Sequence, residues 1–181
     1  MSNLLLHVCC GPCATYVVGR LREQGHKVTA CWYNPNIHPC HEHQRRLEAM
    51  EALSQAVDLP LIVEPGYDLI AYFRAVVGHE ADRCPHCYRL RLEAVATLAR
   101  DRGFQAFTTT LLISPYQQHD VLRQVGEALA EENGVQFHYE DFRPGFRESH
   151  CLAGDLGLYR QPYCGCVYSE WERHARFKIG S

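Results

Sequence analysis

The chain has 181 residues, a net charge of −3, 46% hydrophobic residues and 22% charged residues. This length predicts a single catalytic domain, residues 1–181, with a core of its own, and the composition is that of an ordinary globular protein. The charge balance excludes a globally basic surface for nucleic acid, although it is compatible with a local basic face.

The first residues are not typical of an export signal. The apolar run at residues 4–6 is short, no basic segment precedes it, and no cleavage site follows. No apolar run of transmembrane length occurs elsewhere. We therefore expect a cytoplasmic protein with no membrane partner, where structural disulfides rarely persist.

Strand and helix patterns alternate along the chain. Short apolar or alternating runs predict strands at residues 4–8, 26–33, 61–63, 107–110 and 135–139. Helical spacing predicts helices at residues 14–24, 42–59, 67–77, 85–102, 117–133 and 145–157, followed by a loop at 159–169 and a short charged helix. This alternation predicts an α/β fold whose parallel sheet is covered by helices on both faces.

Three segments with unusual residues follow predicted strands directly. They span residues 9–13, 34–38 and 110–115. In a parallel sheet these segments meet at one edge, where such folds place their active sites. The sequence therefore predicts one shared site at the carboxyl ends of the strands.

Seven of the ten cysteines fall into three groups near predicted loops. They are Cys9, Cys10 and Cys13, then Cys84 and Cys87, and finally Cys164 and Cys166. Thiolates bind iron–sulfur clusters and zinc, and they are also a two-electron redox group. Of the other cysteines, we expect Cys31 and Cys151 to be buried apolar residues and Cys40 not to be a ligand.

Cys10-Gly11-Pro12-Cys13 has the sequence of the thioredoxin active site. A helix start lowers the pKa of such a thiol, so a thioredoxin-like thiol oxidoreductase is one alternative. Three features argue against this alternative. Another cysteine precedes the pair, and the motif follows the first strand of the chain. A thioredoxin-like site would also leave the other cysteine groups unexplained.

Cys84-Pro85-His86-Cys87 is a second C-x-x-C pair at a predicted helix start, and two such pairs supply four thiolates. A zinc-stabilised RNA-binding module is the non-enzymatic alternative. Adjacent Cys9 and Cys10 suit different irons of one cluster better than one tetrahedral zinc ion, and a chain with this core needs no metal for folding. The spacing therefore favours an iron–sulfur centre.

Cys164-Gly165-Cys166 is too closely spaced for an unstrained disulfide. Gly165 gives the backbone the freedom that a labile disulfide, or joint ligation of one metal, requires.

Basic and aromatic residues occur near these segments. The arginines are Arg83, Arg89, Arg91, Arg143, Arg147 and Arg160, and the tyrosines are Tyr88, Tyr116, Tyr159 and Tyr163. Together they suit phosphates and stacked bases, although surface arginines and core tyrosines are an equally ordinary interpretation. We expect His38 and His119 to be hydrogen-bonded structural residues.

Taken together, five motifs resemble the cobalamin-independent epoxyqueuosine reductase family. They are His7-Val8-Cys9-Cys10-Gly11-Pro12-Cys13, Tyr33-Asn34-Pro35-Asn36-Ile37-His38-Pro39, Arg83-Cys84-Pro85-His86-Cys87-Tyr88, Thr109-Thr110-Leu111-Leu112-Ile113-Ser114-Pro115-Tyr116-Gln117 and Leu158-Tyr159-Arg160-Gln161-Pro162-Tyr163-Cys164-Gly165-Cys166. They span nearly the whole chain in the family's order, which makes them more specific than any single pair.

The resemblance implies a fold like the nucleotide-binding α-hydrolase and ATP-pyrophosphatase (HUP-like) group. It also implies reduction of the epoxide of epoxyqueuosine to queuosine at the wobble position of a tRNA anticodon, with an electron donor that the sequence does not name. The implied 4Fe-4S ligands are Cys9, Cys10, Cys84 and Cys87. The implied catalytic pair is Cys164 and Cys166, either as a redox-active disulfide or as ligands of a second metal.

Position 13 carries aspartate in some members of that family. Our hypothesis is that Cys13, Cys164 and Cys166 bind a second, mononuclear iron when both thiols of the C-G-C pair are reduced. We expect the C-terminal part, about residues 141–181, to wrap back over the metal site. Candidate proton donors are Tyr163, His38 and Glu42.

A tRNA sulfur transferase is the remaining alternative, because such enzymes combine paired cysteines with a similar sheet. It requires an ATP-binding Ser-Gly-Gly-x-Asp-Ser type of loop after the first strand, where this chain has a cysteine-rich segment.

Overall fold

The computed structural model describes residues 2–175, which include all ten cysteines. Residues 176–181, the end of the segment expected to cover the site, lie outside the described residues. Among the described helices, none has the length and hydropathy needed to cross a membrane.

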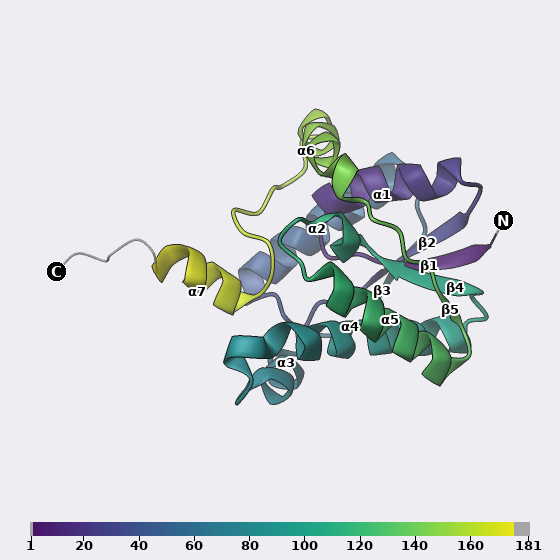
Figure 1. Ribbon diagram of the computed structural model, residues 1–181. Coiled ribbons are helices and arrows are strands. Elements are labelled where there is room, and N and C mark those ends of the chain that lie inside the picture. The colour runs from purple at the N-terminus through teal and green to yellow at the C-terminus, as the bar shows by residue number, and fades with distance from the viewer. Residues whose placement is uncertain (1, 176–181) are drawn as a thin grey trace.

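One five-stranded parallel sheet forms the centre of the molecule (Figure 1). Its strands are β1 (Asn3–His7), β2 (Lys27–Trp32), β3 (Leu61–Val63), β4 (Ala106–Thr109) and β5 (Gln136–Phe137). Their order across the sheet is β3-β2-β1-β4-β5, so the first strand lies in the middle. In register, Leu5 is opposite Thr29 of β2 and Phe107 of β4.

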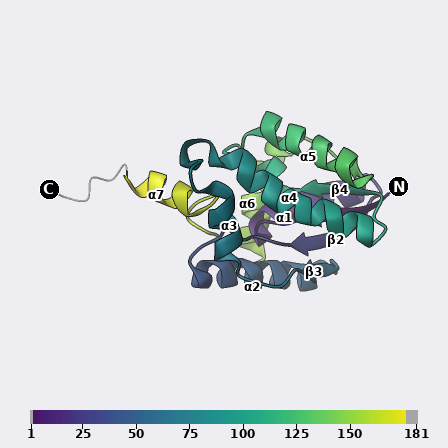
Figure 2. The ribbon, with the colours of Figure 1, turned by 90° about the horizontal axis from the view of Figure 1, so that it is seen from below.

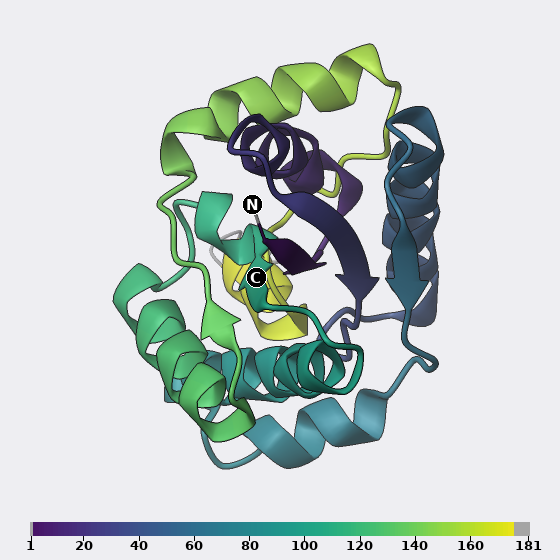
Figure 3. The same cartoon turned by 90° about the vertical axis from the view of Figure 1, so that its right-hand side faces the viewer.

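Helices cover the sheet on both faces, which confirms the predicted fold class (Figure 3). The helices are α1 (Gly11–Glu23), α2 (Cys40–Ala56), α3 (Leu69–Val76), α4 (Arg83–Asp101), α5 (His119–Asn133), α6 (Phe146–Asp155) and α7 (Val167–Ala175). Three 3-10 turns, Glu80–Asp82, Thr110–Ile113 and Arg143–Gly145, join them. α1, α2 and α6 lie on one face, and α3, α4 and α5 lie on the other.

The burial of the central strand follows from this two-sided cover. Leu4, Leu5 and Leu6 are successive residues, so their side chains point to alternate faces, and all three are fully buried. A continuous apolar run is the pattern expected of a strand that has helices on both sides.

Most element boundaries differ by one to three residues from the sequence-based prediction, and three of the differences have a structural consequence. α1 begins at Gly11 rather than residue 14, because Pro12 fits the first helical turn, where its missing N–H is not needed. α2 begins at Cys40 rather than residue 42. β5 is an edge strand with only two paired residues, so the longer apolar run at 135–139 is mostly irregular.

The segments after β1, β2 and β4 meet at the carboxyl edge of the sheet, as predicted. The chain between α6 and α7, residues 156–166, passes across this edge, and α7 lies beyond it (Figures 1 and 2). This arrangement brings the last cysteine pair to the edge that already holds the first group.

Candidate metal centre at the sheet edge

The first cysteine group lies where β1 ends and α1 begins. Cys10 is the residue that precedes the helix, and Cys13 lies in its first turn. The sulfur atoms of Cys9, Cys10 and Cys13 all lie within 4.8 Å of one another, and those of Cys9 and Cys10 are 4.0 Å apart. Because the N-terminus of a helix carries a partial positive charge, this position favours thiolates and therefore metal binding.

The three thiols of this group are not equivalent. Interaction with the Cys10 and Cys13 thiols holds the pKa of Cys9 well below its usual value, although burial acts against this. The Thr110 hydroxyl donates a hydrogen bond to Cys9 Sγ at 3.3 Å, and it accepts one from the Cys9 backbone N–H at 3.1 Å. Gln161 Nε2 donates to Cys10 Sγ at 3.1 Å. Cys9 is therefore the preferred site for negative charge.

The second group lies at the start of α4. Cys87 is buried and Cys84 is half-buried, and Pro85 lies in the first turn as predicted. Burial raises the pKa of Cys87 to about 11, against the opposing effect of Arg91. As at α1, a helix N-terminus faces the thiols, so two helix starts contribute positive potential to the same edge.

The third group is carried by the segment that crosses the edge. Gly165 has a φ of +117°, and a Cβ there would lie 2.6 Å from Ser169 Oγ, so the backbone at this position requires a glycine. Ser114 Oγ lies 3.3 Å from Cys164 Sγ, and Gln117 Nε2 donates to the same sulfur at 3.4 Å. Cys164 and Cys166 are free thiols, as are the other eight cysteines.

Cys164 is the residue at which the three groups meet. It lines a cavity of about 10 Å³ with Cys9, and a cavity of about 220 Å³ with Cys13. A further cavity of about 50 Å³ is lined by Cys84, Cys87, Cys164 and Cys166. Cys84 and Cys87 do not belong to the group whose sulfurs lie within 4.8 Å. A cubane cluster is wider than a single ion, so its ligands need not lie so close together.

Buried arginines surround these thiols. Arg46 and Arg91 are each 3% exposed, and both line the small cavity that holds Cys9 and Cys164. Arg46 Nη2, Arg83 Nε and Arg91 Nε are buried without a hydrogen-bond partner. Arg46 pairs with Glu42 at 2.6 Å, whereas Arg91 forms no ion pair with any described carboxylate and donates to Asn34 Oδ1. A buried cation requires a compensating anion, so this donor set fits an anionic metal–thiolate group.

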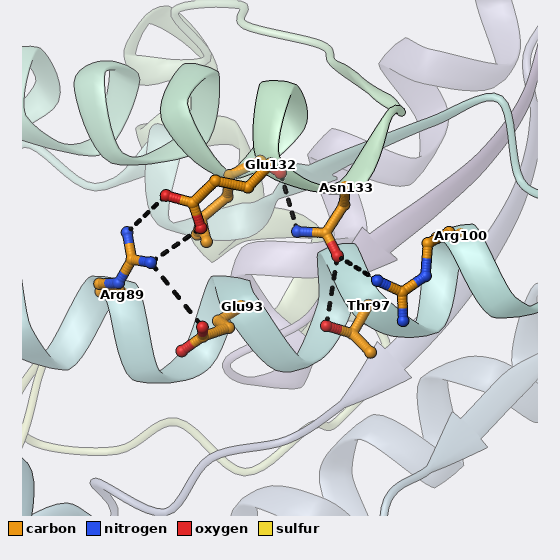
Figure 4. Close-up of polar contacts among 7 residues, drawn as sticks. Arg89, Glu93, Thr97, Arg100, Glu132 and Asn133 are labelled. Carbon is orange, nitrogen blue, oxygen red and sulfur yellow. Dashed lines mark hydrogen bonds and ion pairs between the residues drawn. The ribbon is translucent and has the colours of Figure 1, made fainter.

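Three of the six arginines noted in the sequence line cavities at this edge of the sheet, and the other three do not. Arg83 and Arg91 are at the site, and Arg160 lines the cavity of about 220 Å³. Arg89 fits the ordinary surface interpretation, because it pairs with Glu132 of α5 at 2.8 Å (Figure 4). Arg143 is likewise engaged, by Asp141 at 2.6 Å, and Arg147 is exposed on α6.

The expectations for two histidines and for the three remaining cysteines are met at some positions and not at others. His119 is buried and its Nε2 donates to the Ser114 carbonyl at 3.3 Å, as expected. His38 is buried, as a structural residue would be, but neither ring nitrogen has a close hydrogen-bond partner among the described residues. Cys31 is buried as predicted and Cys40 is exposed, whereas Cys151 is exposed and corrects the prediction of a buried residue.

Two of the three candidate proton donors, Tyr163 and Glu42, have hydrogen-bond partners away from the thiols. Tyr163 donates its hydroxyl proton to the His38 carbonyl at 3.0 Å. Glu42 accepts from Arg46 and also from the Tyr159 hydroxyl, at 2.7 Å. These contacts fasten the crossing segment to α2 and to the loop before it. The hydroxyl protons of Tyr159 and Tyr163 are therefore donated to oxygen atoms and not to a thiol.

Sequence reasoning did not single out several residues that contact the thiols. Gln117, Ser114 and Gln161 stand inside the quoted motifs, so their polar side chains beside cysteines were a readable signal. Arg46 had no such signal, because it lies in a polar helix, and only the fold places the Tyr163 ring of the crossing segment 4.7 Å from its guanidinium.

Comparisons with known proteins agree with this geometry. Residues 4–172 match the model of the family described as "Epoxyqueuosine reductase QueH". The protein of that name from Dehalococcoides mccartyi is 46% identical over 174 residues, which is 96% of each chain. The one from Thermotoga maritima is 33% identical over 186 residues, covering 97% of this chain and 94% of the relative.

A solved structure supports the fold alone. It is described as a predicted subunit of tRNA methyltransferase from Methanocaldococcus jannaschii, and it matches with a TM-score of 0.54 at 12% identity. The match covers 84% of this chain and 76% of the other. This likeness agrees with the predicted α/β fold, and the family match covers most of the chain. The chain therefore belongs to the epoxyqueuosine reductase QueH family and is an oxidoreductase.

Proposed function

We propose that this chain reduces the epoxide of epoxyqueuosine, at the wobble position of a tRNA anticodon, to the cyclopentene of queuosine. Removing the epoxide oxygen as water consumes two electrons and two protons, so the site must accept electrons from an external donor. The observation that carries the proposal is the convergence of three cysteine groups on Cys164, beneath an open cavity of about 220 Å³. The names of the matching relatives supply the reaction.

The proposed cluster ligands are Cys9, Cys10, Cys84 and Cys87. Cys13, Cys164 and Cys166 either bind a second iron, or the last two alternate between dithiol and disulfide. When bound, a 4Fe-4S cluster would supply electrons singly, and the second iron or the dithiol would complete the two-electron reduction. The buried guanidiniums of Arg46 and Arg91 support an anionic centre at this position.

The chain's own residues orient the reacting sulfur. Ser114 and Gln117 contact Cys164 Sγ and hold it at the wall of the cavity that it shares with Cys13. Tyr159 and Tyr163 fasten the crossing segment to α2 and to the loop after β2. Residues 141–175 then form the outer wall of the site, so we propose that residues 1–181 act as one catalytic domain in the cytoplasm.

One experiment tests this function. The protein is reconstituted anaerobically with iron and sulfide, given epoxyqueuosine-containing tRNA and a chemical reductant, and the digested nucleosides are measured by mass spectrometry. Conversion to queuosine supports the proposal. A colourless zinc protein that binds RNA without turnover would instead favour the RNA-binding module, because zinc has a filled d shell and iron–sulfur clusters absorb visible light.

Metal analysis and Mössbauer spectra test the second iron, but the chain contains another group able to bind metal. His79, Asp82 and His86 have potential ligand atoms within 4.8 Å of one another on the surface near α4. The spectra are therefore compared with those of a His79→Ala/His86→Ala variant. A mononuclear iron signal that persists in this variant supports the cysteine site, and its loss assigns that iron to the histidines.

A further inference from the structure

The mouth of the cavity is lined by one exposed aromatic ring and two arginines. Tyr116 is 73% exposed, although its backbone N–H is held by Ser114 Oγ at 3.3 Å. The edge of its ring packs against Phe146, with the ring centroids 6.0 Å apart and the planes at 82°. Phe146 contacts His150 in the same way, at 4.7 Å and 74°. Tyr116 is therefore a supported ring that still presents area to solvent.

Tyr116 shares the lining of two cavities with the thiols of the proposed reacting centre. It lines the cavity of about 220 Å³ with Cys13 and Cys164, and an adjoining cavity of about 360 Å³ with Cys164. A group seated against the exposed part of the ring would thus adjoin the cavity of about 220 Å³, which is where the proposed function requires the reacting nucleoside to approach Cys164.

The two arginines above this cavity lack acidic partners. Arg160 and Arg173 line the cavity of about 220 Å³, and neither forms an ion pair with a described residue. Glu172 precedes Arg173 in the chain and lines the adjoining cavity of about 360 Å³ with it, but its carboxylate pairs with Arg83 at 2.8 Å. Two uncompensated positive charges beside an exposed ring form a cationic and aromatic surface on a chain whose net charge is −3.

We propose that Tyr116, Arg160 and Arg173 form a subsite for the nucleotides that flank the reacting base. One unpaired base stacks on the Tyr116 ring, and the adjacent phosphates pair with Arg160 and Arg173. The inference rests on the proposed function, because it takes the substrate to be single-stranded anticodon RNA. Such RNA is recognised through stacking on aromatic side chains and charge pairing with the backbone.

The test measures binding of the reconstituted protein to a fluorescently labelled, unmodified anticodon stem–loop RNA by anisotropy. Tyr116→Ala should weaken the affinity on the order of 10- to 100-fold, and Tyr116→Phe, which keeps the ring, should stay within about 2-fold of the parent. Because the side chain is largely exposed, its truncation should leave the fold intact, which circular dichroism checks.

Arg160→Gln and Arg173→Gln test the phosphate contacts through salt. Each should reduce the slope of log affinity against log salt concentration by roughly 0.7, the value for one contact to single-stranded nucleic acid. Matched controls lie elsewhere on the surface. Trp171, 65% exposed, lines a different cavity with Phe73, and Arg102 follows the far end of α4. Trp171→Ala and Arg102→Gln should bind like the parent.

The outcomes separate the subsite from the function. The subsite is overturned if Tyr116→Ala binds like the parent, if the control variants lose as much affinity, or if the parent does not bind the stem–loop. If the parent converts epoxyqueuosine-containing tRNA while Tyr116→Ala keeps full affinity, only the subsite fails. If the parent shows no conversion but the predicted binding differences appear, the subsite stands and the reductase proposal fails.

Discussion

The Arg91 guanidinium donates a hydrogen bond to Asn34 Oδ1 at 2.7 Å, and this contact joins the helix of the second cysteine group to the loop after β2. The Asn34 amide also donates to the Val8 carbonyl at 2.9 Å, immediately before Cys9. One buried side chain thus connects the segments that carry two of the cysteine groups. Arg91 also lines the small cavity with Cys9 and Cys164, and its Nε has no hydrogen-bond partner among the described residues.

Arg91→Gln should lower the reduction potential of the reconstituted centre. Removing a buried positive charge makes added negative charge less favourable, and a shift of roughly 50 mV corresponds to about 1 kcal/mol for a one-electron couple. The measurement is an anaerobic redox titration followed by EPR. Arg89→Gln is the matched control on the same helix, because Arg89 pairs with Glu132 on the surface. Equal potentials for Arg91→Gln and the parent would show that Arg91 does not act on the centre.

Substituting a proposed cluster ligand should remove cluster iron, whereas substituting a proposed reacting cysteine should mainly lower turnover. Cys84→Ala and Cys10→Ala should lose cluster iron and its visible absorbance, because each removes a ligand. Cys164→Ser should keep most of the cluster iron but lower turnover by at least about 100-fold, the usual scale for losing a group at the reacting centre. Iron analysis and single-turnover assays distinguish these results.

Cys151→Ser is the control for the cysteine variants, since Cys151 is exposed on α6. It should keep both iron and activity. Full loss of cluster iron in Cys164→Ser would move that residue into the cluster ligand set.

The order of elements and the location of the site could be predicted from local pattern. The apolar run before Cys9 marks a strand that is buried on both faces, and the next residues must lie at its carboxyl end. Nothing in that pattern indicates which later segment crosses the same edge. The burial of Arg46 depends on this crossing, so a residue that looks like part of a solvated helix becomes part of the site.

Cys151 shows the same limit on α6. Its apolar character suggested burial, but α6 packs through Ser149 and Ala153, which are 1% and 0% exposed. Cys151 lies two residues from each of them, on the opposite side of the helix, and is exposed. Residue type alone therefore does not determine which face of a short helix packs.

Tyr159→Phe should loosen the segment that carries Cys164 and Cys166. The Tyr159 hydroxyl donates to Glu42 at 2.7 Å, and the Arg45 guanidinium lies 3.9 Å from the centre of its ring. Losing the hydrogen bond should cost about 1 kcal/mol and increase amide hydrogen exchange at residues 158–166. Mass spectrometry of exchanged peptides measures this change.

Tyr139→Phe is the control for that exchange experiment. Tyr139 lies after β5, away from the crossing segment, and its hydroxyl has no hydrogen bond to the described residues. Exchange at residues 158–166 that is the same in both variants and the parent would contradict a fastening role for Tyr159.

Two glycines of α1 should respond to alanine in opposite directions. A Cβ at Gly11 would lie 2.7 Å from the Ala49 carbonyl oxygen of α2, so Gly11→Ala should push the helices apart and destabilise the protein by about 1–3 kcal/mol. Gly19 is exposed in the same helix with nothing within 4 Å of such a Cβ, and Gly19→Ala should stabilise by about 0.5–1 kcal/mol. Urea unfolding measures both, and destabilisation by Gly19→Ala would refute the comparison.

Acid should destabilise the fold partly through His38. Its ring is enclosed by Tyr67, Tyr72 and Phe73, with ring centroids 5.2–5.5 Å away. Burial, and then the charge of His43, lower the pKa of His38 below its usual value. The folded state therefore keeps the ring neutral, while in the unfolded chain it binds a proton as the pH falls through about 6.5. Extra proton binding by the unfolded state means that stability is present above this pH and lost below it.

His38→Phe keeps an aromatic ring in the enclosure and removes the titrating group. The difference in melting temperature between pH 7.5 and pH 5.5, measured by anaerobic calorimetry, should therefore be smaller for His38→Phe than for the parent. His41→Gln removes an exposed histidine from α2 and should keep the parent's difference. An unchanged pH dependence in His38→Phe would mean that other groups account for the acid sensitivity.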